Sequence, residues 1–323
     1  MNALNSFAPV ALFVYGRPDH TKRTLDSLAS NRIASQTALH IFSDAPKSPV
    51  HFAAVQAVRE VIRNYSDAFA SVTIIEQTSN QGLANSIISG VSSLLRSGGG
   101  RIIVVEDDLE TANGFLSFMN DALNCYESDP AIFSISGYLP PGAVLKLPND
   151  CKNDVLLVPR HCSWGWAIWQ DRWATIDWQV SDYPQFRDSP ELRASFNQGG
   201  PDMADTLDMQ MRGEVDSWAI RCAYAAARQR RYTVYPRVSF VDNIGLDGTG
   251  VHCGENPRFR NSLGLAMSAW HLPRRLKADQ RVIQAFRLAH RMPRRNRLHI
   301  WLRDVVERAG LLPTAKRILG RAS

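Results

Sequence analysis

The sequence predicts an α/β fold in which a mostly parallel sheet is flanked by helices. Two observations lead to this prediction. Short β-type runs alternate with amphipathic helical patterns through the first 126 residues, and repeated β–α units of this length build parallel sheets covered by helices on both faces. With 323 residues, of which 45% are hydrophobic and 21% charged, the chain can also bury a sizeable core.

The predicted elements form four strand–helix pairs. Runs rich in β-branched and aromatic residues, such as ALFVY and LHIFS, indicate strands, and apolar residues spaced three or four apart indicate helices. The strands are expected at 11–15, 39–43, 72–77 and 102–107, and the helices that follow them at 20–28, 50–64, 83–95 and 111–126. In sheets of this kind, ligands bind beyond the carboxyl ends of the strands.

Charged residues follow three of the predicted strands. Arg17 comes after the first strand, Asp44 after the second, and the run RIIVVEDDLE contains Glu106, Asp107 and Asp108 at the end of the fourth. Three neighbouring carboxylates repel one another unless a positive group shares their site or they point apart. Acids also favour the start of a helix, which is the alternative interpretation of the triplet. Because all three strands end at the same edge, we favour a ligand site.

The usual phosphate-binding motifs are absent. No G-x-G-x-x-G follows the first strand, no G-x-x-x-x-G-K-[ST] occurs, and SGGGR at 97–101 precedes a strand and so indicates a turn. A carboxylate cluster at a strand end suits a divalent cation that carries phosphate oxygens. This pattern predicts a nucleotide-diphosphate substrate.

Apolar runs and cysteines give the expected location. The longest apolar runs, at 9–14 and 102–105, are far shorter than the roughly 20 residues that span a bilayer, and the first residues carry no recognisable export signal. Five scattered cysteines without a C-x-x-C pair indicate neither a disulfide framework nor a zinc site. We therefore expect a cytoplasmic protein.

The C-terminal part of the chain is strongly basic. Residues 271–323 hold 14 Lys and Arg against 3 acids, whereas the first 270 hold 23 basic and 28 acidic residues. Apolar stripes flanked by Arg, at 282–288 and 298–306, are typical of a helix on anionic lipid. The alternative is that these helices pack on the acidic body. No nucleic acid is expected, since few aromatic residues interleave with the Arg. We expect a catalytic domain at 1–265 and a basic helical extension at 266–323.

Several blocks of the sequence resemble a known family. The segment VVEDDLETANGFLSF at 104–118 resembles the acidic motif of the GT-A glycosyltransferases, and specifically the N-acetylglucosaminyltransferase I family. Similar blocks occur in the same order over residues 8–255, namely APVALFVYGRPDHTKRTLDSL, FSDA, SISGY, CSWGWAIWQDRW, VDSW and VYPRVSFVDNIGLDGTGVH. The resemblance implies a GT-A, Rossmann-like fold and an inverting, metal-dependent transfer of sugar from a nucleotide donor.

The resemblance also implies roles for the charged residues. Asp108 would coordinate Mn²⁺ or Mg²⁺ that bridges the diphosphate, while Glu106 and Asp107 would contact ribose or sugar hydroxyls. Asp44 would accept a hydrogen bond from uracil, and Arg17 would lie near the nucleotide. The structural alternatives are a turn residue for Asp44 and a surface charge at a helix start for Arg17.

Inverting transfer needs a carboxylate that takes the acceptor hydroxyl proton opposite the leaving diphosphate. By the resemblance, Asp216 in GEVDSWAIR is this base. Other acids lie close by in the sequence, at Asp202, Asp205, Asp208 and Glu214. Asp208 and Glu214 are the main alternatives.

Two further segments carry binding predictions. HCSWGWAIWQDRW holds four tryptophans, and Trp166 is either core or a pocket wall that stacks on sugar, since the neighbouring Gly165 allows close approach of the backbone. The glycine-rich segment NIGLDGTGVHCGEN is either an ordinary loop or a lid over the donor, with Gly248 as a hinge and His252 near the diphosphate or metal.

These observations together predict a glycosyltransferase. It would move a sugar from a nucleotide-diphosphate donor, a UDP-sugar by the resemblance, to a glycan or lipid-linked acceptor in polysaccharide biosynthesis. It would work in the cytoplasm, with peripheral binding to the inner face of the plasma membrane through its tail. The alternatives are a sugar nucleotidyltransferase and an inactive relative that binds glycan or membrane.

Overall fold

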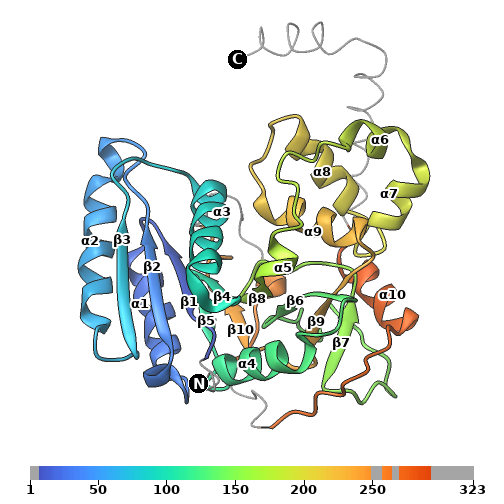
Figure 1. Ribbon diagram of the computed structural model, residues 1–323, viewed down its shortest axis with the longest axis horizontal. Helices are drawn as coiled ribbons and strands as arrows, with labels where there is room; N and C mark the ends of the chain where they lie inside the picture. Colours follow the sequence, from blue (N-terminus) through green and yellow to red (C-terminus); the bar gives the residue numbers. More distant parts are fainter. Residues whose placement is uncertain (1–6, 249–256, 264–268, 292–323) are drawn as a thin grey trace, which may run out of the picture.

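The computed structural model describes residues 7–248, 257–263 and 269–291. An eight-stranded sheet with the order β3-β2-β1-β4-β8-β6-β9-β7 runs through it (Figure 1). Its strands are β1 Val10–Val14, β2 Ala38–Ser43, β3 Ser71–Glu76, β4 Arg101–Glu106, β6 Ile132–Ser136, β7 Val155–Val158, β8 Trp166–Trp169 and β9 Tyr232–Pro236. The β3–β2, β2–β1, β1–β4 and β6–β9 pairs are parallel, and the pairs formed by β8 and β7 are antiparallel. The predicted α/β class is confirmed.

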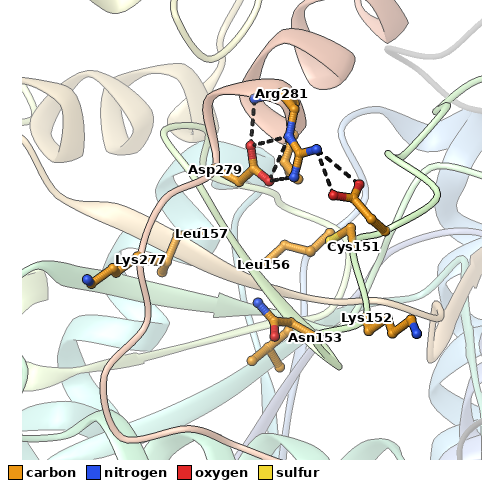
Figure 2. A pocket seen from close by; sticks show the side chains of 11 residues that line it. Cys151, Lys152, Asn153, Leu156, Leu157, Lys277, Asp279 and Arg281 are labelled. Carbon is orange, nitrogen blue, oxygen red and sulfur yellow. Dashed lines mark hydrogen bonds and ion pairs between the residues drawn. The ribbon is translucent and has the colours of Figure 1, made fainter.

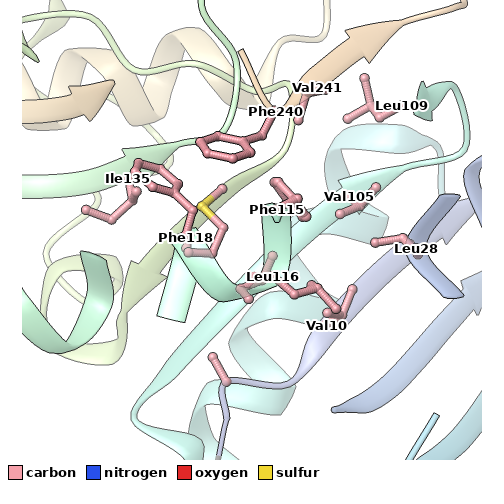
Figure 3. Packing of buried hydrophobic residues seen from close by; sticks show 14 of the residues in the cluster. Val10, Leu28, Val105, Leu109, Phe115, Leu116, Phe118, Ile135, Phe240 and Val241 are labelled. Atoms are coloured by element: carbon pink, nitrogen blue, oxygen red, sulfur yellow. The ribbon is translucent and has the colours of Figure 1, made fainter. Parts of the chain in front are cut away.

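Helices cover both faces of the sheet. They are α1 Pro18–Ala29, α2 Phe52–Ile62, α3 Leu83–Leu94, α4 Phe115–Tyr126, α5 Gln170–Trp173, α9 Trp218–Arg228 and α10 Gln280–Ala289. The helices α6 Tyr183–Asp188, α7 Pro190–Phe196 and α8 Met203–Met211 instead pack with α9 in a separate cluster. Successive residues of β1 point to opposite faces: Leu12 packs with α1, α2 and α4, and Phe13 with α3 and α9. Figure 3 shows part of the first cluster, in which Phe115, Phe118 and Phe240 are fully buried. The four predicted strand–helix pairs are all present.

The predicted start of the fourth helix at Thr111 is wrong. Residues Leu109–Thr111 form a short strand, β5, which pairs antiparallel with β10, Val241–Asn243, and α4 begins only at Phe115. Leu109 and Thr111 are buried while Glu110 between them is partly exposed, an alternation that fits a strand. This small sheet holds the chain after the acidic triplet against the segment that enters the glycine-rich loop.

Part of the predicted C-terminal extension belongs to the body. The α10 side chains of Val282 and Phe286 are buried and share a core with β7 and β9. Trp270 packs edge-on against Phe118 and Phe240, so the core that contains α4 also continues past residue 265. The alternative of packing on the body is therefore realised for α10, whose apolar stripe is not free to contact lipid.

The second predicted apolar stripe of the tail, at 298–306, lies outside the described residues. None of the helices among residues 7–248, 257–263 and 269–291 is long and apolar enough to cross a membrane. Binding of the tail to a membrane surface stays a prediction.

Candidate functional site

The order in which the chain adds strands to the sheet reverses between β1 and β4. From β1 the chain adds β2 and then β3 on one side, and afterwards crosses through α3 to place β4 on the other side of β1. Ligands of open α/β sheets bind at such a switch point, outside the carboxyl ends of the strands. Arg17 follows β1, and Glu106 ends β4 opposite Phe13 of β1. The arginine and the acidic triplet therefore meet at the switch point.

Arg17 supplies the positive charge that the triplet requires. Its Nη2 donates to the Asp107 carboxylate and, at 3.0 Å, to Asp108 Oδ2. The Tyr15 backbone N–H also donates to Asp107, at 3.2 Å. Pro18 occupies the first turn of α1, where its fixed φ suits a helix start, and so sets the direction in which the chain leaves Arg17. Two of the three carboxylates, Asp107 and Asp108, thus share one guanidinium at the start of α1.

Burial shifts the pKa values of several side chains in this cluster. Burial raises the pKa of Glu106 well above its ordinary value; Asp108 and Asp107 add to the rise, and Arg17 opposes it. Burial also raises the pKa of Asp107, again against the opposing effect of Arg17. Burial alone lowers the pKa of Arg17, but Asp107 and Asp108 outweigh it and the net pKa is raised. The cluster therefore keeps a fixed cation beside Glu106 and Asp107, two acids that resist ionisation.

One atom of this cluster lacks a partner. Arg17 Nη1 is buried and donates no hydrogen bond to any of the described residues. A buried donor left unpaired costs about 1–3 kcal/mol, and more when it is charged. An anion placed against Nη1 would satisfy it, so the arrangement favours a negatively charged ligand at this point.

Asp44 lies at the same edge, but its carboxylate already accepts several hydrogen bonds from the protein. Its carboxylate accepts from the backbone N–H groups of Gln81 and Gly82, each at 2.9 Å, and from Asn80 Nδ2 at 3.0 Å. Asp44 is 7% exposed and thereby fixes the loop that enters α3. A uracil N–H would have to donate to a carboxylate that already accepts these three hydrogen bonds, so contact of Asp44 with the base stays a prediction. Asn80 presents its side chain beside Asp44 and was not identified from the sequence.

The glycine-rich segment begins directly over the acids. The Ile244 N–H donates to the Asp108 carbonyl at 2.8 Å, which extends the pairing of β10 with β5. Gly245 follows, and a Cβ there would overlap Asp108 Oδ2 and lie 2.9 Å from Arg17 Nη1. Gly248 adopts a φ of 88°, a backbone that favours glycine. His252 lies outside the described residues. Sequence reasoning missed Gly245, whose need for a small side chain arises only from this contact.

Gly245→Ala is expected to weaken donor binding by about tenfold or more, because the added methyl displaces the paired Asp108 and Arg17 side chains. Isothermal titration with UDP-sugar and Mn²⁺ measures the change. Gly142→Ala is the matched control, since a Cβ on Gly142 would meet no atom within 4 Å. Equal affinity in both variants would contradict the placement of the donor against Asp108.

Asp216 lies at the same edge of the sheet, just before α9. Trp218, the first residue of α9, stacks on Trp166 with ring centroids 5.0 Å apart. Trp166 in turn pairs with Val104, two residues before the end of β4. The Asp216 side chain is 61% exposed, and its described partner is Arg221, at 3.2 Å. An exposed carboxylate near the end of β4 suits the predicted role of base.

The competing acids are more strongly engaged. Asp208 is 7% exposed and accepts from both Arg193 terminal nitrogens, at 2.9 and 2.7 Å, and from the Tyr183 hydroxyl. Glu214 pairs with Arg212 at 2.9 Å. The remaining pairs are Asp202 with Arg160 and Asp205 with Arg193. Asp208 therefore has a structural role within the α6–α9 region, and Asp216 as the base stays a prediction.

The prediction that Trp166 contacts the nucleotide sugar is wrong for the structure described. Trp166 is fully buried and stacks between Trp218 and Trp173, with His161 near its edge. A ring without exposed surface cannot stack on a sugar unless this cluster opens. The core interpretation of the tryptophan segment therefore holds for Trp166.

The acids do not form a metal site from protein atoms alone. Among the described residues, no three His, Cys, Asp or Glu side chains are arranged to hold a metal ion. Divalent cations that carry nucleotide phosphates are often bound by only one or two carboxylates, however, with phosphate oxygens completing the shell. Asp108, whose side chain is 16% exposed, fits the requirement for a single carboxylate ligand.

A separate pocket of about 230 Å³ lies between β7 and α10 (Figure 2). Arg281 forms its wall and pairs with Asp150 at 2.9 Å and Asp279 at 2.8 Å, while Leu156 and Leu157 line its floor. β7 is four positions from β4 in the sheet, so this pocket is not part of the switch-point site.

Comparison with known proteins gives only distant similarities. No family model and no curated protein matches the chain. Among the solved structures that align with it are S. aureus TarS 1–349 (10% identity, 72% of this chain and 59% of that one, TM-score 0.38), the nucleoside-diphosphate-sugar pyrophosphorylase of Vibrio cholerae RC9 (12%, 73% and 95%, 0.38), and apo mouse xyloside xylosyltransferase 1 (12%, 68% and 80%, 0.34). At these TM-scores the chain is assigned to no family, and the resemblance to the N-acetylglucosaminyltransferase I family stays a prediction.

Proposed function

We propose that this protein is an inverting glycosyltransferase that moves a sugar from a nucleotide-diphosphate donor, a UDP-sugar, to a glycan or lipid-linked acceptor. The observation that carries the proposal is the Arg17 guanidinium at the switch point, whose Nη1 atom is buried. It is held by Asp107 and Asp108 while its Nη1 has no partner among the described residues. A cation with one unsatisfied donor, placed where α/β sheets bind nucleotides, supports an anionic nucleotide ligand.

In this proposal, each charged group has a separate task. Arg17 Nη1 donates to a diphosphate oxygen, and Glu106 and Asp107 accept from ribose or sugar hydroxyls. Asp216 takes the proton of the attacking acceptor hydroxyl, on the side of the sugar opposite the diphosphate. The acceptor oxygen then bonds to the anomeric carbon as the bond to the nucleotide diphosphate breaks, which inverts the configuration.

Asp108 is the residue that would hold a divalent cation together with the donor phosphates. Mn²⁺ or Mg²⁺ bound there would supply Lewis-acid neutralisation of the charge on the diphosphate. The segment after Gly245 would exclude water from the donor, since Ile244 already fixes its first residues to the acid cluster.

Donor hydrolysis tests the proposal. Purified protein incubated with UDP-, GDP- and dTDP-sugars and Mn²⁺ is expected to release nucleoside diphosphate slowly from the UDP class. EDTA and Asp108→Ala are expected to abolish the release, because both remove the groups that bind the diphosphate. Asp67→Ala, an exposed acid before the amino end of β3, is the matched control and should hydrolyse donor at the wild-type rate.

Two other results would replace the proposal. A sugar nucleotidyltransferase would consume nucleoside triphosphate and sugar 1-phosphate with release of pyrophosphate, and would leave nucleotide sugars intact. An inactive binding protein would hydrolyse none of the donors in the panel.

A further inference from the structure

Trp164 and Trp166 point to different environments because of the glycine between them. Gly165 has a φ of 63°, in the left-handed region that glycine adopts without strain. A Cβ at this position would also lie 2.8 Å from Val241 and 3.2 Å from Phe115. As a result Trp166 is fully buried, whereas Trp164 is only partly buried.

The sheet register places Trp164 near the edge of the sheet where β4 and β6 end. Trp166, the first residue of β8, is opposite Val104 of β4 on one side and Ser136 of β6 on the other. The residues that precede β8 therefore lie at the carboxyl ends of β4 and β6. Trp164 comes two residues before β8, and the left-handed backbone of Gly165 ends the strand pairing between them.

Other aromatic side chains hold Trp164 in place. The Tyr138 ring meets it edge to face at 4.6 Å, and the Phe259 ring approaches to 6.5 Å with an interplanar angle of 77°. Tyr138 is itself 3% exposed, and its hydroxyl donates to the Phe259 carbonyl at 2.9 Å. Three rings from distant parts of the chain are thus fixed against one another, and Trp164 presents a preorganised surface rather than a mobile side chain.

We propose that Trp164, supported by Tyr138 and Phe259, binds the sugar ring of a saccharide acceptor. An indole ring has a broad apolar surface at low entropic cost, and the C–H faces of a pyranose stack well on it. The proposed diphosphate position lies on the β1 side of the triplet, whereas Trp164 lies on the β8 side and packs against the core cluster that contains α4, on the opposite face of the sheet from Trp166 and Trp218. This assignment rests on the proposed function, and it names a saccharide rather than a lipid as the group that receives the sugar.

Fluorine NMR of the full chain labelled with 5-fluorotryptophan tests the assignment. Trp164→Phe identifies the Trp164 resonance by its loss. Titration with methyl β-D-glucopyranoside and methyl α-D-mannopyranoside is expected to shift this resonance with saturation for at least one glycoside, while the resonance of buried Trp166 stays in place. Glycerol, a polyol without a ring face, should leave Trp164 unshifted.

A second variant tests the supporting ring. Phe259→Ala is expected to weaken the apparent affinity for the glycoside by about threefold or more, as for the loss of one aromatic contact. A Trp164 resonance that does not move, or that moves equally with glycerol, would overturn the acceptor assignment. Donor hydrolysis by the wild type separates the two proposals. If the wild type does not hydrolyse donor, the proposed function is wrong. If it hydrolyses donor but the Trp164 resonance does not shift with glycoside, only the acceptor assignment is wrong.

Discussion

Asp216→Asn is expected to lower kcat for donor hydrolysis by about 10²- to 10⁴-fold while the KM for the donor stays near its wild-type value. The amide cannot accept the proton of the attacking hydroxyl or water, yet it has the size of the carboxylate it replaces. Folding should be nearly unaffected, since Asp216 is 61% exposed and pairs with Arg221 at the surface. Steady-state kinetics of nucleoside diphosphate release measures both constants.

Asp188→Asn is the matched control for this variant. Asp188 is similarly exposed, at 65%, and pairs with the neighbouring Arg187 at 2.8 Å. It should keep the wild-type kcat. If Asp216→Asn kept most of the activity while Glu214→Gln lost it, the base would be Glu214 and the assignment of Asp216 would be wrong.

Arg17→Ala is expected to abolish measurable donor binding and to lower the free energy of unfolding by about 3 kcal/mol. The substitution removes the donor group proposed for the diphosphate and leaves the buried Asp107 without its positive partner. Urea unfolding and titration with UDP-sugar measure the two effects. The double variant Arg17→Ala/Asp107→Asn should recover part of the lost stability, because it also removes the uncompensated charge.

The stability lost in Arg17→Ala is expected to depend on pH. The pKa values of Glu106 and Asp107 are raised by burial, so the folded protein binds more protons than the unfolded chain once pH rises above the ordinary carboxyl range. In that interval the free energy of unfolding falls with increasing pH. Arg17 opposes the rise, and its removal should enlarge the effect. The deficit relative to wild type should therefore be greater near about pH 8 than near about pH 5; a deficit independent of pH would contradict this account.

Local patterns were sufficient to predict the first half of the fold. The strands and helices through α3 follow from short β-type runs and helical spacing, since both periods are properties of neighbouring residues. β5 was missed because three residues, Leu109–Thr111, become a strand only by pairing with β10, about 130 residues further along the chain. The burial of α10 was left open for a similar reason, because its apolar stripe is the same whether it contacts lipid or β7.

The sequence allowed the charged residues of the candidate site to be predicted, but not the contacts between their side chains. Charged residues after parallel strands indicated the correct edge, because topology alone brings those ends together. The direct pairing of Arg17 with Asp107 and Asp108, and the need for a glycine at 245, depend on side-chain geometry that no spacing encodes. Which of Trp164 and Trp166 is fully buried could not be predicted either, since it depends on the backbone angle of Gly165.

The switch between β1 and β4 also limits what a shorter piece of this chain could do. Arg17 and the acids are separated by about ninety residues of sequence, a span that must fold completely before opposite charges meet. A polypeptide ending before β4 would expose the arginine without any counter-charge. Grafting this recognition chemistry onto another scaffold would therefore require both strands and the crossover through α3, since neither half contains a usable motif of its own.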